Sequence, residues 1–81
     1  MPVVWRESGF RFVIYVDDHP PPHVHIFADG EMKVNIVGPA GLPHQVYSNG
    51  FNVSERRKAM DIVLQRQVEF LAEWEVTHGD G

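Results

Sequence analysis

The stretch HVHIFADGEMKVNIV, residues 23–37, decides the fold of this chain. It contains two runs in which apolar and polar side chains alternate, residues 23–28 and 31–37, separated by Asp29-Gly30. Alternation of this kind is typical of a strand that is buried on one face, and Asp-Gly is a strong signal for a hairpin turn. The stretch therefore predicts two antiparallel strands joined at that turn.

Further strands are expected on both sides of this hairpin. Residues 10–17 alternate in the same way, and the short β-rich segment 2–6 precedes them across a turn at residues 7–9. Residues 44–47 form another short candidate strand between segments rich in glycine, proline and asparagine. We expect an antiparallel sheet of three to five strands.

The hydrophobic period changes to that of a helix after Phe51. Asn52 is followed three residues later by Glu55, which is a capping-box pattern, with Ser54 as the alternative cap. The apolar residues that follow share one face of a helical wheel: Ala59, Met60, Val63, Leu64, Phe70, Leu71 and Trp74. This stripe predicts an amphipathic helix whose apolar face packs on the sheet.

One long helix over residues 53–78, capped near Gly79, accounts for the whole stripe. Ile62 widens the stripe, and Gln67 is its one polar member. We expect Gln67 to bond to a sheet-edge or loop group or to face a second subunit. The predicted architecture is a single α+β domain over residues 1–81, with a small sheet and a helix packed on one of its faces.

Composition limits the classes of function. The 81 residues contain no cysteine, which excludes disulfides, thiolate ligands and a cysteine nucleophile, and we expect a cytoplasmic protein. Seven Lys and Arg against eleven Asp and Glu give a net charge of −4, which disfavours general binding to nucleic acid. No apolar run approaches the roughly 18 residues that a membrane span needs, so no membrane role is expected.

The candidate functional motif is Pro21-Pro22-His23-Val24-His25. Side chains two residues apart in a strand point to the same face, so we expect His23 and His25 side by side behind a stiff proline segment. Three interpretations are open for this pair. The imidazoles are ligands of a metal, an acid and a base in catalysis, or two side chains on the exposed face of a half-buried sheet.

The metal interpretation makes His23 and His25 two ligands of zinc or another divalent metal. Two ligands alone are too few for such a site. A third would have to come from His19, His44, Asp17, Asp18 or a partner chain.

The catalytic interpretation is RNA cleavage. One imidazole would take the proton of a ribose 2′-hydroxyl and the other would protonate the leaving oxygen, while Arg11 or Lys33 stabilises the transition state. Alternation brings four residues to the face opposite the apolar one: Arg11, Tyr15, His25 and Lys33. The acidic composition weighs against a freely acting RNA-cleaving protein, so nucleic acid is the less favoured partner.

The run Arg56-Arg57-Lys58 falls in the first helical turn, where positive charge opposes the helix dipole. Free backbone amides beside three cations form a site for an anion or an acidic partner. A solvated helix face is the other explanation, because exposed charge runs usually face water.

The element order and several motifs resemble an uncharacterised bacterial family known as domain of unknown function 4160. The resemblance rests on the proline-histidine motif of residues 21–25 and on supporting matches at Met1-Pro2, Arg6, residues 9–12, Lys33, Gly50-Phe51, Leu71, Trp74 and His78-Gly79. The resemblance covers nearly the whole chain, but between Asn35 and Tyr47 the sequence departs from the family pattern.

Members of that family look like components of toxin–antitoxin-like two-gene modules. The resemblance therefore implies a protein-interaction component that binds a cognate small protein through an exposed sheet edge or the helix face. A homo-oligomer is the alternative assembly.

Overall fold

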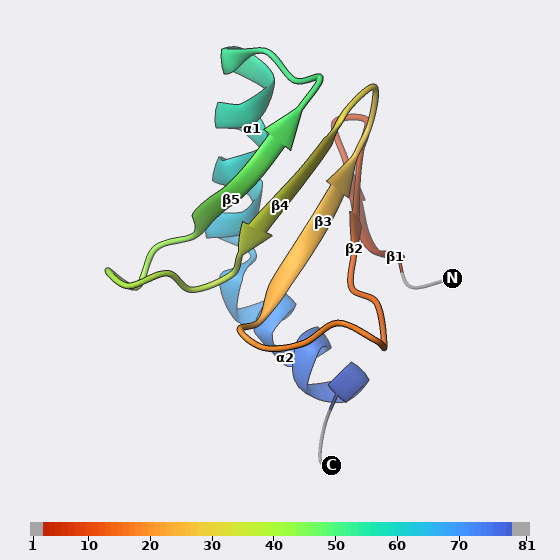
Figure 1. Cartoon of the computed structure of the whole chain (residues 1–81), viewed down its shortest axis with the longest axis vertical. Coiled ribbons are helices and arrows are strands. Elements are labelled where there is room, and N and C mark those ends of the chain that lie inside the picture. Colours follow the sequence, from red (N-terminus) through yellow and green to blue (C-terminus); the bar gives the residue numbers. More distant parts are fainter. Residues whose placement is uncertain (1–2, 79–81) are drawn as a thin grey trace.

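The structure is a computed structural model, and it describes residues 3–78. Five antiparallel strands form one sheet in chain order: β1 (Val3–Glu7), β2 (Phe10–Val13), β3 (His23–Phe27), β4 (Glu31–Asn35) and β5 (His44–Asn49). Two helices, α1 (Val53–Gln65) and α2 (Gln67–His78), follow and lie behind the sheet in Figure 1. The predicted α+β class is confirmed. Within residues 3–78 no helix is long and apolar enough to cross a membrane.

The hydrophobic core lies between one face of the sheet and the two helices. The ring of Phe12 on β2 lies 5.4 Å from the ring of Phe70 on α2, which joins the two layers. The buried apolar side chains of this core are Phe10, Phe12, Ile14, Val24, Ile26, Met32, Val34, Ile36, Phe51, Ala59, Ile62, Val63, Phe70 and Trp74. Burial of each large member contributes about 1.5–3 kcal/mol, so this layer is the main source of stability.

The prediction of one long helix is partly wrong: residues 53–78 are helical as predicted, but the chain forms two helices that meet at Arg66. The Arg66 backbone leaves the helical region at φ −111° and ψ 22°. Its guanidinium lies 3.6 Å from the ring centre of Trp5 and 3.6 Å from the Glu7 carboxylate. These contacts with β1 hold Arg66 against the sheet at the break. Hydrophobic periodicity does not predict them.

The break changes which helical side chains reach the core. Ile62, beside the predicted stripe, is buried, whereas Leu64, within it, is 45% exposed. Gln67 Nε2 donates to the carbonyl oxygens of Ile36 at 2.8 Å and Gly41 at 2.9 Å. The predicted bond from Gln67 to a loop group is therefore confirmed, and it fastens the segment between β4 and β5 to α2.

Helix α1 begins at the cap that the sequence predicts. The Glu55 N–H donates to Asn52 Oδ1 and the Asn52 N–H donates to Glu55 Oε1, each at 2.8 Å. This reciprocal pair satisfies two backbone donors, and such a cap stabilises a helix by about 1 kcal/mol. Ser54 is not the cap. The predicted cap at Gly79 lies outside the described residues.

Several strand bounds differ from the prediction. β2 ends at Val13 instead of residue 17, because the chain turns away from the sheet and the Asp18 N–H donates to the Tyr15 carbonyl at 3.2 Å. β4 ends at Asn35 instead of residue 37, because the Ile36 N–H bonds outside the ladder. The remaining strands are β1 at Val3–Glu7, with Pro2 outside the described residues, β3 at His23–Phe27 and β5 at His44–Asn49.

The predicted hairpin at Asp29-Gly30 is confirmed, since β3 and β4 pair antiparallel on either side of it. A Cβ at Gly30 would collide with the carbonyl oxygen of Asn49, so only glycine fits the close approach to the end of β5. The register places His25 between Val13 on β2 and Lys33 on β4. These pairs define the face of the sheet that points away from the helices.

Candidate metal centre

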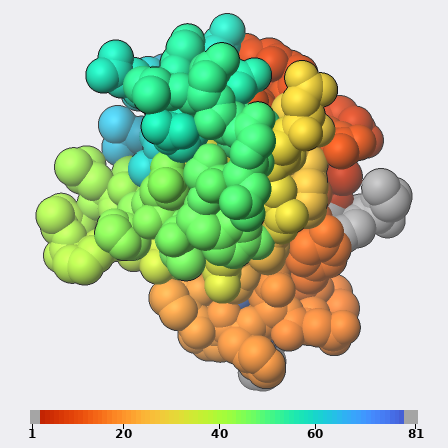
Figure 2. Space-filling model, turned by 45° about the horizontal axis from the view of Figure 1, so that its top comes forward, coloured from red at the N-terminus to blue at the C-terminus, as the bar shows by residue number. Residues whose placement is uncertain are grey.

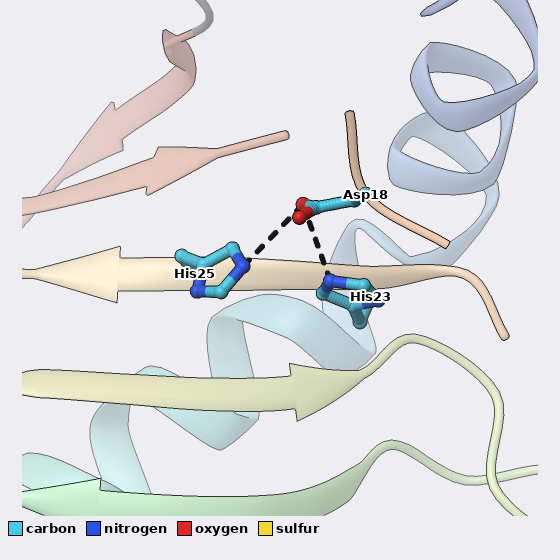
Figure 3. Close-up of side chains that lie close together, drawn as sticks. All are labelled: Asp18, His23 and His25. Carbon is cyan, nitrogen blue, oxygen red and sulfur yellow. Dashed lines mark ion pairs between the residues drawn. The ribbon is translucent and has the colours of Figure 1, made fainter. Parts of the chain in front are cut away.

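Strand β3 presents His23 and His25 side by side on the face opposite the helices, as predicted (Figure 3). The centres of the two imidazole rings lie 5.1 Å apart. Asp18 comes from the segment between β2 and β3, and its carboxylate faces the Nε2 atoms of both rings (Figure 3). Three side chains that could bind one ion therefore come together.

The distances within this group match a metal site. Asp18 Oδ2 lies 3.2 Å from Nε2 of His23 and 3.3 Å from Nε2 of His25. Zinc bonds of about 2.0–2.1 Å to nitrogen and 2.0–2.2 Å to oxygen place two ligands of a tetrahedral site about 3.3–3.5 Å apart. One ligand atom from each residue lies within 4.8 Å of the others.

Asp18 is thus the candidate third ligand, among those that the sequence left open, that lies beside both histidines. The other candidates are not members of the group that the described residues form: His19, His44 and Asp17. Asp17 and His19 are exposed although they adjoin Asp18. Only Asp18 is turned toward β3, and the Tyr15 backbone N–H, which donates to Asp18 Oδ2 at 3.3 Å, helps to hold it there.

The contacts of His23 define its hydrogen-bonding state. Its Nδ1 lies 2.9 Å from the carbonyl oxygen of Pro21, and since a carbonyl only accepts, Nδ1 carries the proton and donates. A neutral imidazole then has its lone pair on Nε2, facing the Asp18 carboxylate. Two acceptors that face each other at this distance need a positive charge between them, which a proton or a metal ion supplies.

His25 lies between two carboxylates. Its Nε2 faces Asp18 at 3.3 Å, and its Nδ1 faces Glu31 Oε2 at 3.9 Å. Both ring nitrogens are buried and have no hydrogen-bond partner among the described residues. Burial lowers the pKa of His25 below its ordinary value of 6.5, and the opposing attraction of Asp18 does not cancel this effect. The neutral imidazole, which is the form that binds metals, is therefore favoured.

A second layer of contacts positions the group. Tyr47 donates from its hydroxyl to Glu31 Oε2 at 2.8 Å, and this hydrogen bond and burial raise the pKa of Tyr47 above 10.0. Metal-binding histidines usually present the second ring nitrogen to a carboxylate or a backbone carbonyl. The second ring nitrogen of His25 faces the Glu31 carboxylate, and that of His23 faces the Pro21 carbonyl.

The group is covered and does not lie on an open sheet surface. Only 3% of His23 is exposed, and its ring lies 5.2 Å from the Trp74 ring of α2. The side chains of His25 and Asp18 are 14% and 18% exposed. The interpretation that both imidazoles are exposed is therefore wrong. Alternation gives the face of each side chain, but the cover comes from distant segments.

The other candidate residues lie around this group. Lys33 pairs with His25 across β3 and β4, and Arg11 pairs with Phe27, so all of them share one face as predicted. The Arg11 guanidinium lies 6.0 Å from the centre of the Phe27 ring. No ion pair joins Arg11 or Lys33 to the three-residue group among residues 3–78. The catalytic roles of these residues stay a prediction.

Sequence reasoning missed Glu31 and Tyr47. The hairpin register contained a signal for Glu31, because a residue two positions before Lys33 shares its face and lies diagonally across from His25. Tyr47 pairs with Lys33 from β5, and the pairing of β5 was not predicted. The run Arg56-Arg57-Lys58 lies in α1, in the layer on the other side of the sheet.

Fold and site together define a small α+β domain, in which an antiparallel sheet is backed by helices and carries an Asp/His/His group on its other face. The chain belongs to the family described as Domain of unknown function (DUF4160), whose model matches residues 9–75. The predicted resemblance is thereby confirmed, and the matched range includes Asp18, His23 and His25. The comparisons with curated proteins and with solved structures gave no match.

Proposed function

We propose that this protein binds a divalent transition metal through Asp18, His23 and His25. The observation that carries the proposal is the position of Asp18 Oδ2, 3.2 Å and 3.3 Å from two imidazole nitrogens whose opposite ring nitrogens face acceptors. Two imidazoles and one carboxylate suit zinc or iron(II) better than magnesium or calcium, which prefer oxygen ligands. Three protein ligands leave a coordination position for water or another group.

The bound metal would join two segments that are separate in the sequence. Asp18 belongs to the segment between β2 and β3, whereas both histidines belong to β3. A ligand that binds only the folded arrangement stabilises it, so metal binding and ordering of this segment are coupled.

The test is a zinc titration of the chelator-treated protein, monitored by thermal unfolding and by elemental analysis. At a free zinc concentration 100 times the dissociation constant, we expect stabilisation of about 2.7 kcal/mol. For a domain of this size that is an increase in Tm of more than about 10 °C. Elemental analysis should give one zinc ion per chain.

Asp18→Asn and Asp17→Asn form a matched pair of variants. Both remove one carboxylate from neighbouring residues, but only Asp18 faces the imidazoles. Asp18→Asn should abolish the zinc-dependent rise in Tm, and Asp17→Asn should retain it. Equal responses of the two variants would contradict the proposal, as would a wild-type protein that binds no zinc.

A second candidate function is the protein-interaction component of a toxin–antitoxin-like two-gene module, in the cytoplasm. The exposed edge of the sheet at β5 supports it, because unpaired backbone groups on an edge strand can accept a strand from another protein. Co-expression with the product of the adjacent gene tests this role. A stoichiometric complex, and growth arrest by one member that the other relieves, are the expected results, and two independent monomers would contradict it.

RNA cleavage by His23 and His25 is the remaining alternative. It needs both imidazoles to reach a phosphodiester, and the near-complete burial of His23 favours the metal site instead. Cleavage of a labelled RNA by the wild type but not by a His23→Ala, His25→Ala double variant would revive it.

A further inference from the structure

The two edges of the sheet differ in how they are protected. β1 carries Arg6 and Glu7, and the Arg66 guanidinium covers its Trp5 ring. β5 pairs only with β4, five of its six residues are exposed, and it contains no Asp, Glu, Lys or Arg. Charged side chains on an edge normally discourage pairing with another chain. β5 is therefore the edge that is open to an additional strand.

An open groove runs between β5 and α1. Gln45 lines it from the strand, and five residues line it from the helix: Val53, Arg56, Arg57, Met60 and Asp61. Val53 is 52% exposed, and Val46 on the strand is 46% exposed. Figure 2 shows β5 in green and the start of α1 in teal next to each other on one face. A strand added at β5 would lie over this groove.

The charge of the groove indicates what kind of strand fits. Arg56 and Arg57 line it, and neither makes an ion pair within residues 3–78. Asp61 is the only carboxylate in the lining. The groove is thus locally cationic, although the chain as a whole has a net charge of −4. An acidic segment would be attracted here.

A second copy of this chain fits the groove less well. Pairing of β5 with itself about a twofold axis would bring the same surface of each copy together, including Arg56 and Arg57. Like charges that face each other across an interface are costly. A partner with the opposite charge avoids this cost.

We propose that β5 accepts an extended acidic segment of a partner protein as a sixth strand, whose side chains facing α1 lie in the groove beside Arg56 and Arg57. Backbone hydrogen bonds to β5 supply affinity, and alternate side chains of the segment supply specificity. The inference rests on the proposed role as a protein-interaction component, and it gives the partner segment its chemistry. It is independent of the metal site on the other face of the sheet.

The test is a selection of random peptides of about ten residues, displayed on phage, against the immobilised protein. We expect the selected peptides to combine Asp or Glu with β-branched and aromatic residues. A synthetic copy of the best peptide should lose at least about tenfold in affinity when alternate backbone nitrogens are methylated, because it can no longer donate hydrogen bonds to β5.

Arg57→Glu and Lys58→Glu are matched charge reversals on neighbouring exposed residues, and only Arg57 lines the groove. Arg57→Glu should weaken binding of the synthetic peptide by about tenfold or more, and Lys58→Glu should leave it within about twofold. Equal effects of the two variants would overturn the proposal. Selection of basic peptides, selection of none, or full binding by the methylated peptide would also overturn it.

Two further outcomes assign the surface to another occupant and overturn the proposal. One is self-association in analytical ultracentrifugation that competes with the peptide, and the other is a single-stranded RNA that displaces the peptide at lower concentration. The co-expression experiment separates failure of this surface from failure of the partner role. If a complex forms with the adjacent gene product and Arg57→Glu does not affect it, the partner role is supported. The interface would then lie elsewhere, which overturns the proposed surface.

Discussion

The two faces of β3 are both covered, but by different means. Val24 and Ile26 are fully buried against the helices, where burial of apolar area is the stabilising force. His23 is 3% exposed on the opposite face, covered by the segment before β3 and by the Trp74 ring. His23 is thus a polar side chain that is as buried as the core, with the Asp18 carboxylate beside it.

The stability of the two faces depends on different conditions. The apolar face needs no bound ion, and its contribution is nearly independent of pH. The polar face brings Asp18 against two imidazoles and Glu31 near one of them, so its free energy depends on the charges within this group. This difference can be measured with variants on each face.

The largest effect is expected on the apolar face. Ile26→Ala should lower the free energy of unfolding by about 2–5 kcal/mol, because Ile26 is fully buried and the truncation leaves a cavity. Urea unfolding monitored by circular dichroism measures the change. Val68→Ala is the control, since Val68 is 80% exposed and its truncation should cost less than about 0.5 kcal/mol. Similar losses in the two variants would remove the distinction between a packed face and the surface.

An intermediate effect is expected on the polar face. His23→Ala should lower the free energy of unfolding of the metal-free protein by about 1–3 kcal/mol, because it removes the donor to Pro21 and the contact with Trp74. The same variant should lose all zinc-dependent stabilisation. The measurement is urea unfolding with and without zinc.

His44→Ala is the control for His23, because His44 is an exposed histidine on the edge strand β5. We expect it to change stability by less than about 0.5 kcal/mol. If His23→Ala were as mild as His44→Ala, the polar face would act as a solvated surface and the comparison with the apolar face would fail.

Local patterns were sufficient to predict most of the fold. Alternation in residues 23–37 gave the central hairpin and its faces, and the reciprocal bonds of Asn52 and Glu55 are the capping box that the sequence indicates. The break at Arg66 was not predicted, because the apolar stripe continues past it and the side-chain contacts of Arg66 with Trp5 and Glu7 join residues about sixty positions apart. Hydrophobic periodicity reports only the local repeat of apolar side chains along the sequence, not contacts between distant segments.

The candidate site was also predicted only in part. The spacing of His23 and His25 placed them on one face, and Asp18 was one of four residues, beside a partner chain, that could supply the third ligand. Choosing Asp18 requires the path of the segment between β2 and β3, which follows the turn at Tyr15. The burial of His23 likewise depends on Trp74, which comes from the end of α2. Residues that act together through tertiary contacts leave no fixed spacing in the sequence.

The smallest effect is expected where the polar face meets β5. Tyr47→Phe should lower the free energy of unfolding by about 0.5 kcal/mol, because it removes a hydrogen bond to Glu31 that is exposed to solvent. That hydrogen bond raises the pKa of Tyr47 above its ordinary value of 10.0. The contribution is therefore fully present below pH 10 and is lost as the pH rises through the raised pKa of the folded state.

Urea unfolding between about pH 8 and pH 11 should show this loss in the wild type and a smaller one in Tyr47→Phe. Tyr15→Phe is the control, since the Tyr15 hydroxyl makes no hydrogen bond within residues 3–78 although its ring lies 5.2 Å from His25. An alkaline loss that persists unchanged in Tyr47→Phe would mean that Glu31 is not held by Tyr47. The Pro21 carbonyl, the Tyr15 backbone N–H and the Trp74 ring would then be the remaining contacts that position the Asp/His/His group on the polar face.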